Sequence, residues 1–191
     1  MKTLLSVKQT EKVPFLLTLM GEDGEEVCRL TRSEYEAVGS PLAGTPLDEA
    51  CEERIRAFSE AHAAKSAALR ILSFGDNNQK ALSQKLKKRG FSAASAKEAI
   101  EAMKKRGYID EKDQVYRLCV SAANRKLWGQ RKILLTLLSK GYAQADIKEA
   151  LTQAIAAGEI DFEVTKRALL EKKGSDADPQ KIRALLYRYG F

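Results

Sequence analysis

Apolar residues recur with a helical period through most of the chain after residue 60. Two sets of four occupy positions i, i+3, i+4 and i+7: Val115, Leu118, Cys119 and Ala122, and Ile182, Leu185, Leu186 and Tyr189. Residues with this spacing share one face of an α-helix, so each set predicts a helix with one buried side. Together with capping residues and helix-ending glycines, the pattern predicts helices over 61–74, 78–89, 92–106, 111–127, 130–140, 143–157, 162–173 and 179–189.

This helical part of the sequence is repetitive. Three segments with matching glutamine, leucine or isoleucine, glycine and aromatic positions are spaced by 51 and then 49 or 50 residues: 79–91, 130–142 and 180–191. A fixed period of this size indicates repeated supersecondary units that stack on their neighbours. We therefore predict three-helix repeats over 61–110 and 111–160, and a third repeat over 161–191 that lacks its third helix.

The first 60 residues follow a different pattern. Apolar and β-branched residues favour strands over 3–10, 13–20 and 26–30, and the Gly-Glu-Asp-Gly sequence at 21–24 supplies a turn. Thr31 and Glu34 have the spacing of a capping box, which predicts a short helix. Thr45-Pro46 predicts a further helix start, with threonine as the N-cap and proline at the first helical position.

The predicted fold class is therefore mainly α. Tandem three-helix repeats form an elongated curved array, which follows a small N-terminal unit of a β-hairpin or three strands plus a helix over 1–60. The charge divides at the same place, because 1–60 holds 7 basic and 12 acidic residues, a net of −5. Residues 61–191 hold 26 basic and 14 acidic residues, a net of +12, which indicates an anionic partner for the repeats.

The composition argues against an enzyme. The chain has one histidine, His62, and three widely spaced cysteines, which we interpret as core residues of a protein in a reducing compartment. No phosphate-binding glycine loop, nucleophile elbow, metal motif or cofactor motif is present. Asp110-Glu111 is interpreted as a helix start and Asp76-Asn77-Asn78 as a capping loop. No apolar run is long enough for a membrane helix, so we expect a cytoplasmic protein.

The candidate binding residues are the basic clusters of the first two repeats and one tryptophan: Lys87, Lys88, Arg89, Lys104, Lys105, Arg106, Arg125, Lys126, Trp128, Arg131 and Lys132. The basic side chains either neutralise phosphates or form a solvated helix face that keeps the protein soluble. Trp128 either stacks on a base or, as is more usual for tryptophan, packs at a helix–helix junction. The aromatic residues that follow repeat glycines, Phe91, Tyr108 and Tyr142, are expected in the core.

The repeated glycine–aromatic helix ends, the Gly107-Tyr-Ile-Asp-Glu111 junction and the Trp128-Gly-Gln-Arg-Lys-Ile133 segment resemble the RecX family of bacterial regulatory proteins. The similarity covers about 61–191, and the N-terminal hairpin and helix resemble an extension found in many Gram-positive members. Glu111 stands where the family usually has a second aspartate. The resemblance implies a monomeric, non-enzymatic modulator without a cofactor. Its partners would be the RecA filament and the single-stranded DNA held in it, and it would act in recombination, DNA repair and SOS control.

A second interpretation remains open from the residues alone. The three-helix units could act as helix-turn-helix modules of a regulator that binds duplex DNA directly. Such a module needs polar side chains that reach base edges, whereas the second helices here carry mostly leucine at their centres and lysine at their ends. That arrangement favours contacts with the nucleic-acid backbone.

Overall fold

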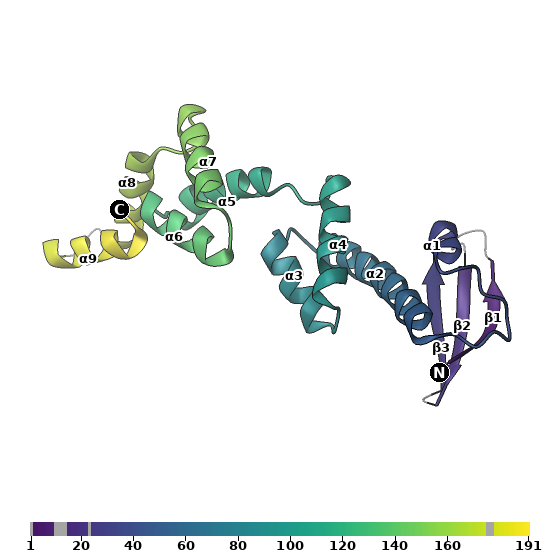
Figure 1. Ribbon diagram of the computed structural model, residues 1–191. Helices are drawn as coiled ribbons and strands as arrows, with labels where there is room; N and C mark the ends of the chain where they lie inside the picture. Colours follow the sequence, from purple (N-terminus) through teal and green to yellow (C-terminus); the bar gives the residue numbers. More distant parts are fainter. Residues whose placement is uncertain (1, 10–14, 23, 175–177) are drawn as a thin grey trace. The chain divides into compact units, whose positions relative to one another are not determined.

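The computed structural model (Figure 1) describes residues 2–9, 15–22, 24–174 and 178–191. Residues 10–14, where two of the predicted strands end and begin, and Asp23 of the predicted turn lie outside these ranges. The chain divides into two compact units. The first unit contains residues 1–75 and 82–108, and the second contains 76–81 and 109–191.

The first unit begins with an antiparallel sheet, as the sequence predicts. Its strands are β1 (Thr3–Lys8), β2 (Phe15–Gly21) and β3 (Gly24–Leu30), in the order β1-β2-β3. Alternation along the strands turns one face of the sheet toward the helices, and the residues on that face are fully buried: Leu4, Leu17, Leu19, Cys28 and Leu30. Ile55 of α2 closes this core.

Two helices pack beside the sheet, and the start of the second corrects a prediction. Helix α1 (Arg32–Ala37) begins with the predicted Thr31–Glu34 capping box. Helix α2 (Glu49–Ser73) is capped by Asp48, so the predicted start at Thr45-Pro46 is wrong. Those two residues instead lie along β1: Thr45 O accepts from Leu4 N–H at 3.0 Å, and Pro46 forms an isolated bridge with Thr3. Helix α2 runs 25 residues without a break, across the 60/61 boundary inferred from composition.

Glu60 joins α2 to the start of α4 (Ala93–Lys105). Its carboxylate accepts hydrogen bonds from Ser92 N–H at 2.6 Å, Ser92 Oγ at 2.9 Å and Ser95 Oγ at 2.9 Å. These bonds outweigh the effect of burial and lower the pKa of the Glu60 carboxyl. Helix α3 (Gln79–Lys88) lies between α2 and α4 in the chain and buries Leu82 and Leu86.

We expect the first unit to lose stability in acid. The Lys2 hydrogen bond lowers the pKa of Glu26, and hydrogen bonds from Thr31 and His62 outweigh burial to lower the pKa of Glu34. Carboxyls with a lowered pKa in the folded state stabilise it above their unfolded pKa, and this contribution is lost as the pH falls through the folded pKa. Urea unfolding of the chain should therefore show a falling midpoint below about pH 4.5. Glu60→Gln should make that fall shallower, and an unchanged pH profile would contradict the assignment.

The second unit consists of helices around a separate core. They are α5 (Glu111–Lys126), α6 (Gln130–Lys140), α7 (Gln144–Ala156), α8 (Phe162–Lys173) and α9 (Pro179–Tyr189). The predicted apolar stripes of α5 and α7 form that core, which includes Val115, Cys119 and Ile147. Tyr142 is buried there as predicted, and Tyr142 Oη donates to Gln114 Oε1 at 3.2 Å. Tyr108 of the first unit is 51% exposed, so its predicted core position is wrong.

Helix α9 is the least buried of these helices. None of its side chains is fully buried, and Ile182, Leu185 and Leu186 are half-buried.

Candidate nucleic-acid interface

The junction between α5 and α6 places the predicted tryptophan among basic residues. Helix α5 ends at Leu127, whose backbone is left-handed with φ 55°, and Gly129 is the N-cap of α6. Trp128 packs against the core of the second unit and is half-buried, as the packing interpretation predicts. Its indole ring still faces charge, because Lys126 Nζ lies 4.7 Å and Lys132 Nζ lies 5.0 Å from the ring centroid. Cations at this distance are attracted by the ring.

The end of α9 reaches the same junction. Gly129 N–H donates to Tyr189 O at 2.7 Å, and Arg131 N–H donates to Gly190 O at 3.3 Å. The first N–H groups of a helix have no partner inside it, and neither does the last set of carbonyls. The end of α9 therefore satisfies the start of α6, and opposite ends of two helix dipoles meet there.

This contact depends on the absence of side chains at two glycines. A Cβ on Gly129 would lie 2.4 Å from Gly190 O. A Cβ on Gly190 would lie 2.4 Å from Lys132 N. Both distances are shorter than any van der Waals contact, so glycine at both positions lets the two backbones approach.

Two tyrosines of α9 extend the aromatic and basic surface. Lys132 Nζ lies 4.6 Å from the Tyr189 ring centroid, so one ammonium contacts both Tyr189 and Trp128. The Arg131 guanidinium lies 4.7 Å from the Tyr187 ring centroid, and its Nη2 donates to Tyr187 Oη at 3.2 Å. Lys173 Nζ donates to the Tyr189 hydroxyl and lowers the pKa of that phenol.

Within the described residues, no carboxylate forms an ion pair with the basic side chains of this surface: Arg125, Lys126, Arg131, Lys132, Lys173 and Arg188. Elsewhere in the same unit Arg117 pairs with Asp76 and Asp113, and Lys112 pairs with Glu149. The surface therefore keeps its positive charge. We call these six residues, with Trp128, Tyr187 and Tyr189, the α5–α6–α9 surface.

The sequence pattern identified only part of this surface. Lys126 and Lys132 lie over the Trp128 ring, and Arg125 and Arg131 precede these two lysines in the chain. The pattern did not identify Tyr187, Lys173 or Arg188. Tyr189 was missed because it was assigned to the apolar stripe of its helix. A usable signal was the alternation of aromatic and basic residues at 187–189.

The other predicted binding residues belong to the first unit. Lys87 and Lys88 lie in the last turn of α3, Arg89 follows them, and all three are exposed. Lys104, Lys105 and Arg106 are exposed at the end of α4, where Lys104 pairs with Glu101 at 3.6 Å. Cations at a helix C-terminus also interact favourably with the helix dipole.

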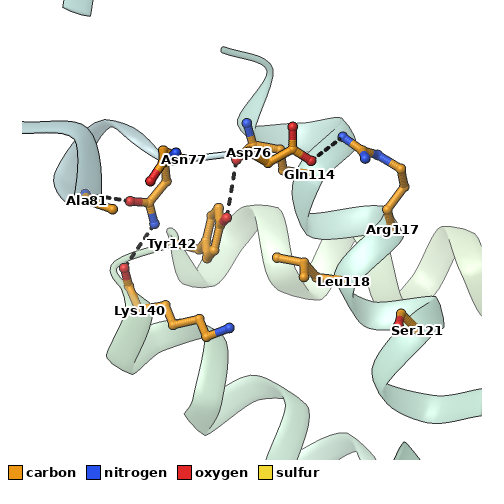
Figure 2. Close-up of a pocket in the computed structure, with 10 residues that line it drawn as sticks. Asp76, Asn77, Ala81, Gln114, Arg117, Leu118, Ser121, Lys140 and Tyr142 are labelled. Carbon is orange, nitrogen blue, oxygen red and sulfur yellow. Dashed lines mark hydrogen bonds and ion pairs between the residues drawn. The ribbon is translucent and has the colours of Figure 1, made fainter. Parts of the chain in front are cut away.

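A cavity of about 430 Å³ in the second unit has a mainly structural role (Figure 2). Asn78 Oδ1 caps α3 by accepting from Ala81 N–H at 2.7 Å, which confirms the predicted capping loop. Asn78 Nδ2 also donates to Lys140 O at 2.9 Å, and Arg117 pairs with Asp76 at 3.0 Å. The polar groups around the cavity thus hold the 76–81 segment on α5 and α6.

Neither a metal site nor a membrane span is found in the described part of the chain. No group of three or more histidine, cysteine, aspartate or glutamate side chains is arranged to hold a metal ion there. None of the helices in the described ranges combines the length and the hydropathy needed to cross a bilayer.

Comparisons with known proteins agree on one family. The sequence model of the first three-helix domain of RecX matches residues 64–108. The regulatory protein RecX of Caldanaerobacter subterraneus is 31% identical over 134 residues, which are 70% of this chain and 67% of the relative. The regulatory protein RecX of Thermotoga maritima is 33% identical over 124 residues, which are 65% of this chain and 74% of the relative.

Solved structures show the same fold. A crystal structure of regulatory protein RecX superposes with a TM-score of 0.73 at 18% identity, covering 100% of this chain and 95% of the solved one. The crystal structure of RecX from Lactobacillus salivarius gives a TM-score of 0.58 at 22% identity, covering 69% of this chain and 88% of the solved one.

Proposed function

The chain belongs to the RecX family of regulatory proteins, and on that premise we propose that it is a non-enzymatic regulator of the RecA recombinase. It binds the RecA filament on single-stranded DNA and inhibits the recombinase and coprotease activities of that filament. It thereby modulates recombination, DNA repair and the SOS response from the cytoplasm. The observation that carries this proposal is the α5–α6–α9 surface, whose cations have no carboxylate partner in the described residues.

The chemistry of that surface suits a nucleic-acid backbone. Each lysine or arginine that neutralises a phosphate releases counterions, and this supplies affinity that does not depend on sequence. The aromatic rings of Trp128, Tyr187 and Tyr189 hold Lys132 and Arg131 in place, so less side-chain freedom is lost on binding. Arginine and lysine bind guanine edges as well as phosphates, but the nine residues of the surface include no asparagine, glutamine or serine, which favours backbone contact over recognition of a duplex sequence.

The proposal is tested by comparing three partners at one salt concentration. Fluorescence anisotropy would measure binding of the chain to duplex DNA, to bare single-stranded DNA and to single-stranded DNA coated with RecA. We expect the RecA-coated strand to bind most tightly, and RecA ATPase and strand exchange to fall as the chain is added. Tightest binding to the duplex, with no effect on RecA, would favour the helix-turn-helix alternative instead.

Binding to the filament should weaken steeply with salt. The six cations of the α5–α6–α9 surface, which form no ion pair among the described residues, can contact several phosphates. Six or more such contacts correspond to a loss of affinity of about 10³–10⁵-fold between 50 and 200 mM salt. Contacts with RecA itself would reduce this slope. Anisotropy titrations over a series of salt concentrations measure it, and an affinity independent of salt would contradict the electrostatic basis of the proposal.

A further inference from the structure

The two edge strands of the sheet in the first unit are each covered over part of their length. At the β1 edge, Leu4 N–H donates to Thr45 O at 3.0 Å, and Gly44 N–H donates to Leu4 O at 2.7 Å. The segment before α2 thus covers the start of β1. Strand β3 forms the other edge, and it is the strand that contacts α2 (Figure 1).

The register shows which backbone groups of β3 point outward. Gly21 pairs with Gly24 in the register, and the closely hydrogen-bonded pairs with β2 fall on alternate residues of β3. Glu25, Val27 and Arg29 therefore direct N–H and C=O away from β2. Arg29 N–H does so visibly, because it donates to Ser59 Oγ at 3.1 Å.

Further along β3 the outward groups are open. Across the described ranges, no hydrogen bond engages the outward N–H and C=O of Glu25 and Val27. Exposed strand edges with unpaired groups are templates for the addition of another strand. The β3 edge at Glu25 and Val27 therefore offers backbone hydrogen bonds to an extended segment.

An acidic groove runs beside this edge. A cavity of about 490 Å³ lies between β3 and α2, and Glu26, Glu53, Glu60 and Arg56 are among its lining residues. The Arg56 guanidinium is already paired with Glu26 at 3.2 Å and with Glu52 at 2.9 Å. Glu53 is exposed and forms no ion pair within the part of the chain that the structure describes. The groove thus carries net negative charge.

The opposite face of the same edge exposes apolar side chains beside the charged Glu25 and Arg29. Val27 is 58% exposed and Met20, on the neighbouring strand, is 39% exposed. Side chains of an added strand alternate between the two faces of a sheet. One set would lie beside Val27, and the other set would point into the groove with Glu53.

We propose that the β3 edge is a docking site for an extended segment of a partner protein, in which apolar and basic residues alternate. The segment adds to β3 as a fourth strand, with its apolar side chains beside Val27 and its lysine or arginine side chains in the acidic groove. A second copy of β3 is a poor occupant, because the two acidic grooves would then carry like charge at the new interface. This site lies in the acidic 1–60 segment of the first unit, and it does not depend on the proposed action on RecA.

The test uses the full chain and labelled ten-residue peptides. The probe alternates valine and lysine, and its control alternates valine and glutamate. Anisotropy measures affinity, and amide hydrogen exchange by NMR locates the contact. We expect the lysine peptide to bind at least about tenfold more tightly than the glutamate peptide and to slow the exchange of the Val27 amide.

Two substitutions separate the backbone contribution from the charge contribution. Val27→Pro removes an outward N–H without touching the ladder to β2, a position where edge strands tolerate proline. Glu53→Lys reverses charge in the groove. Each should weaken binding of the lysine peptide about tenfold while the circular dichroism spectrum and melting temperature stay near those of the parent chain. Arg29→Pro is the matched control for a fold defect. It also removes an outward N–H of β3, but this one is already bonded to Ser59 Oγ, so the substitution breaks a bond within the fold.

Several outcomes would overturn the proposal. They are no binding of the lysine peptide, unchanged affinity in folded Val27→Pro, and slowed exchange confined to amides outside β3 and α2. Concentration-dependent dimerisation that Val27→Pro abolishes would assign the edge to a second copy of the chain and would equally reject a basic partner segment.

Discussion

Gly190→Ala is expected to release helix α9 from α6 and to dismantle the α5–α6–α9 surface. The new Cβ would lie 2.4 Å from Lys132 N and 2.5 Å from Lys132 Cβ, so the backbones must separate. Separation breaks the hydrogen bond from Arg131 N–H to Gly190 O and moves Tyr189 from Lys132. Forced overpacking costs about 1–3 kcal/mol, and a left-handed alanine costs about 1 kcal/mol more. Thermal unfolding should show a drop of about 2–4 °C for each kcal/mol in a chain of this length.

Gly90→Ala is the matched control. Gly90 ends α3 at the equivalent repeat position with φ 90°, close to the φ 86° of Gly190, but a Cβ there would meet no atom within 4 Å. It therefore has the same conformational cost without the clash. Equal losses of melting temperature in the two variants would contradict the close backbone contact at Gly190.

Removing four positive charges from the α5–α6 junction is expected to abolish filament binding at moderate salt. The variant carries glutamine at Arg125, Lys126, Arg131 and Lys132. Glutamine suits Lys132 better than glutamate, because Lys132 Nζ donates to Arg188 O at 3.1 Å and a carboxylate would face that carbonyl. Each phosphate that the variant no longer neutralises should also reduce the slope of log affinity against log salt by about 0.7. Inhibition of RecA ATPase should disappear together with binding.

The control removes charge from the same unit but from other helices. Lys148→Gln with Arg167→Gln changes two exposed residues of α7 and α8. Both variants should keep the helical circular dichroism of the parent chain. If the affinity for the filament falls equally in the control, net charge and not the α5–α6 junction determines binding. Full inhibition of RecA by the four-glutamine variant would place the binding surface elsewhere.

The sequence predicted the local structure well where one local signal decides it. The Thr31–Glu34 capping box, the Asn78 cap and the apolar stripe of α5 were predicted correctly, because each depends on residues within one or two turns. The helix start at Thr45-Pro46 was wrong for the opposite reason. Its local signal was overridden by hydrogen bonds to β1, about 40 residues away in the chain.

The candidate site was predictable only in part. Its basic residues are close in sequence, so a charge pattern identified them. Tyr187 and Tyr189 meet Arg131 and Lys132 across more than 50 residues, and the contact exists because two glycine backbones touch. No periodicity in α6 or α9 reports such a contact. The open β3 edge was similarly hidden, since strand patterns do not say which neighbour a strand lacks.

Hydrogen exchange of the chain bound to RecA-coated single-stranded DNA tests the central claim most directly. The comparison is between the free chain and the filament-bound chain at low salt, with bare single-stranded DNA as a third sample. The account predicts slower exchange of amides around the α5–α6 junction and at the end of α9, over 125–132 and 187–191, and the largest slowing on the filament. Slowing confined to the first unit, with 125–132 unchanged, would contradict it.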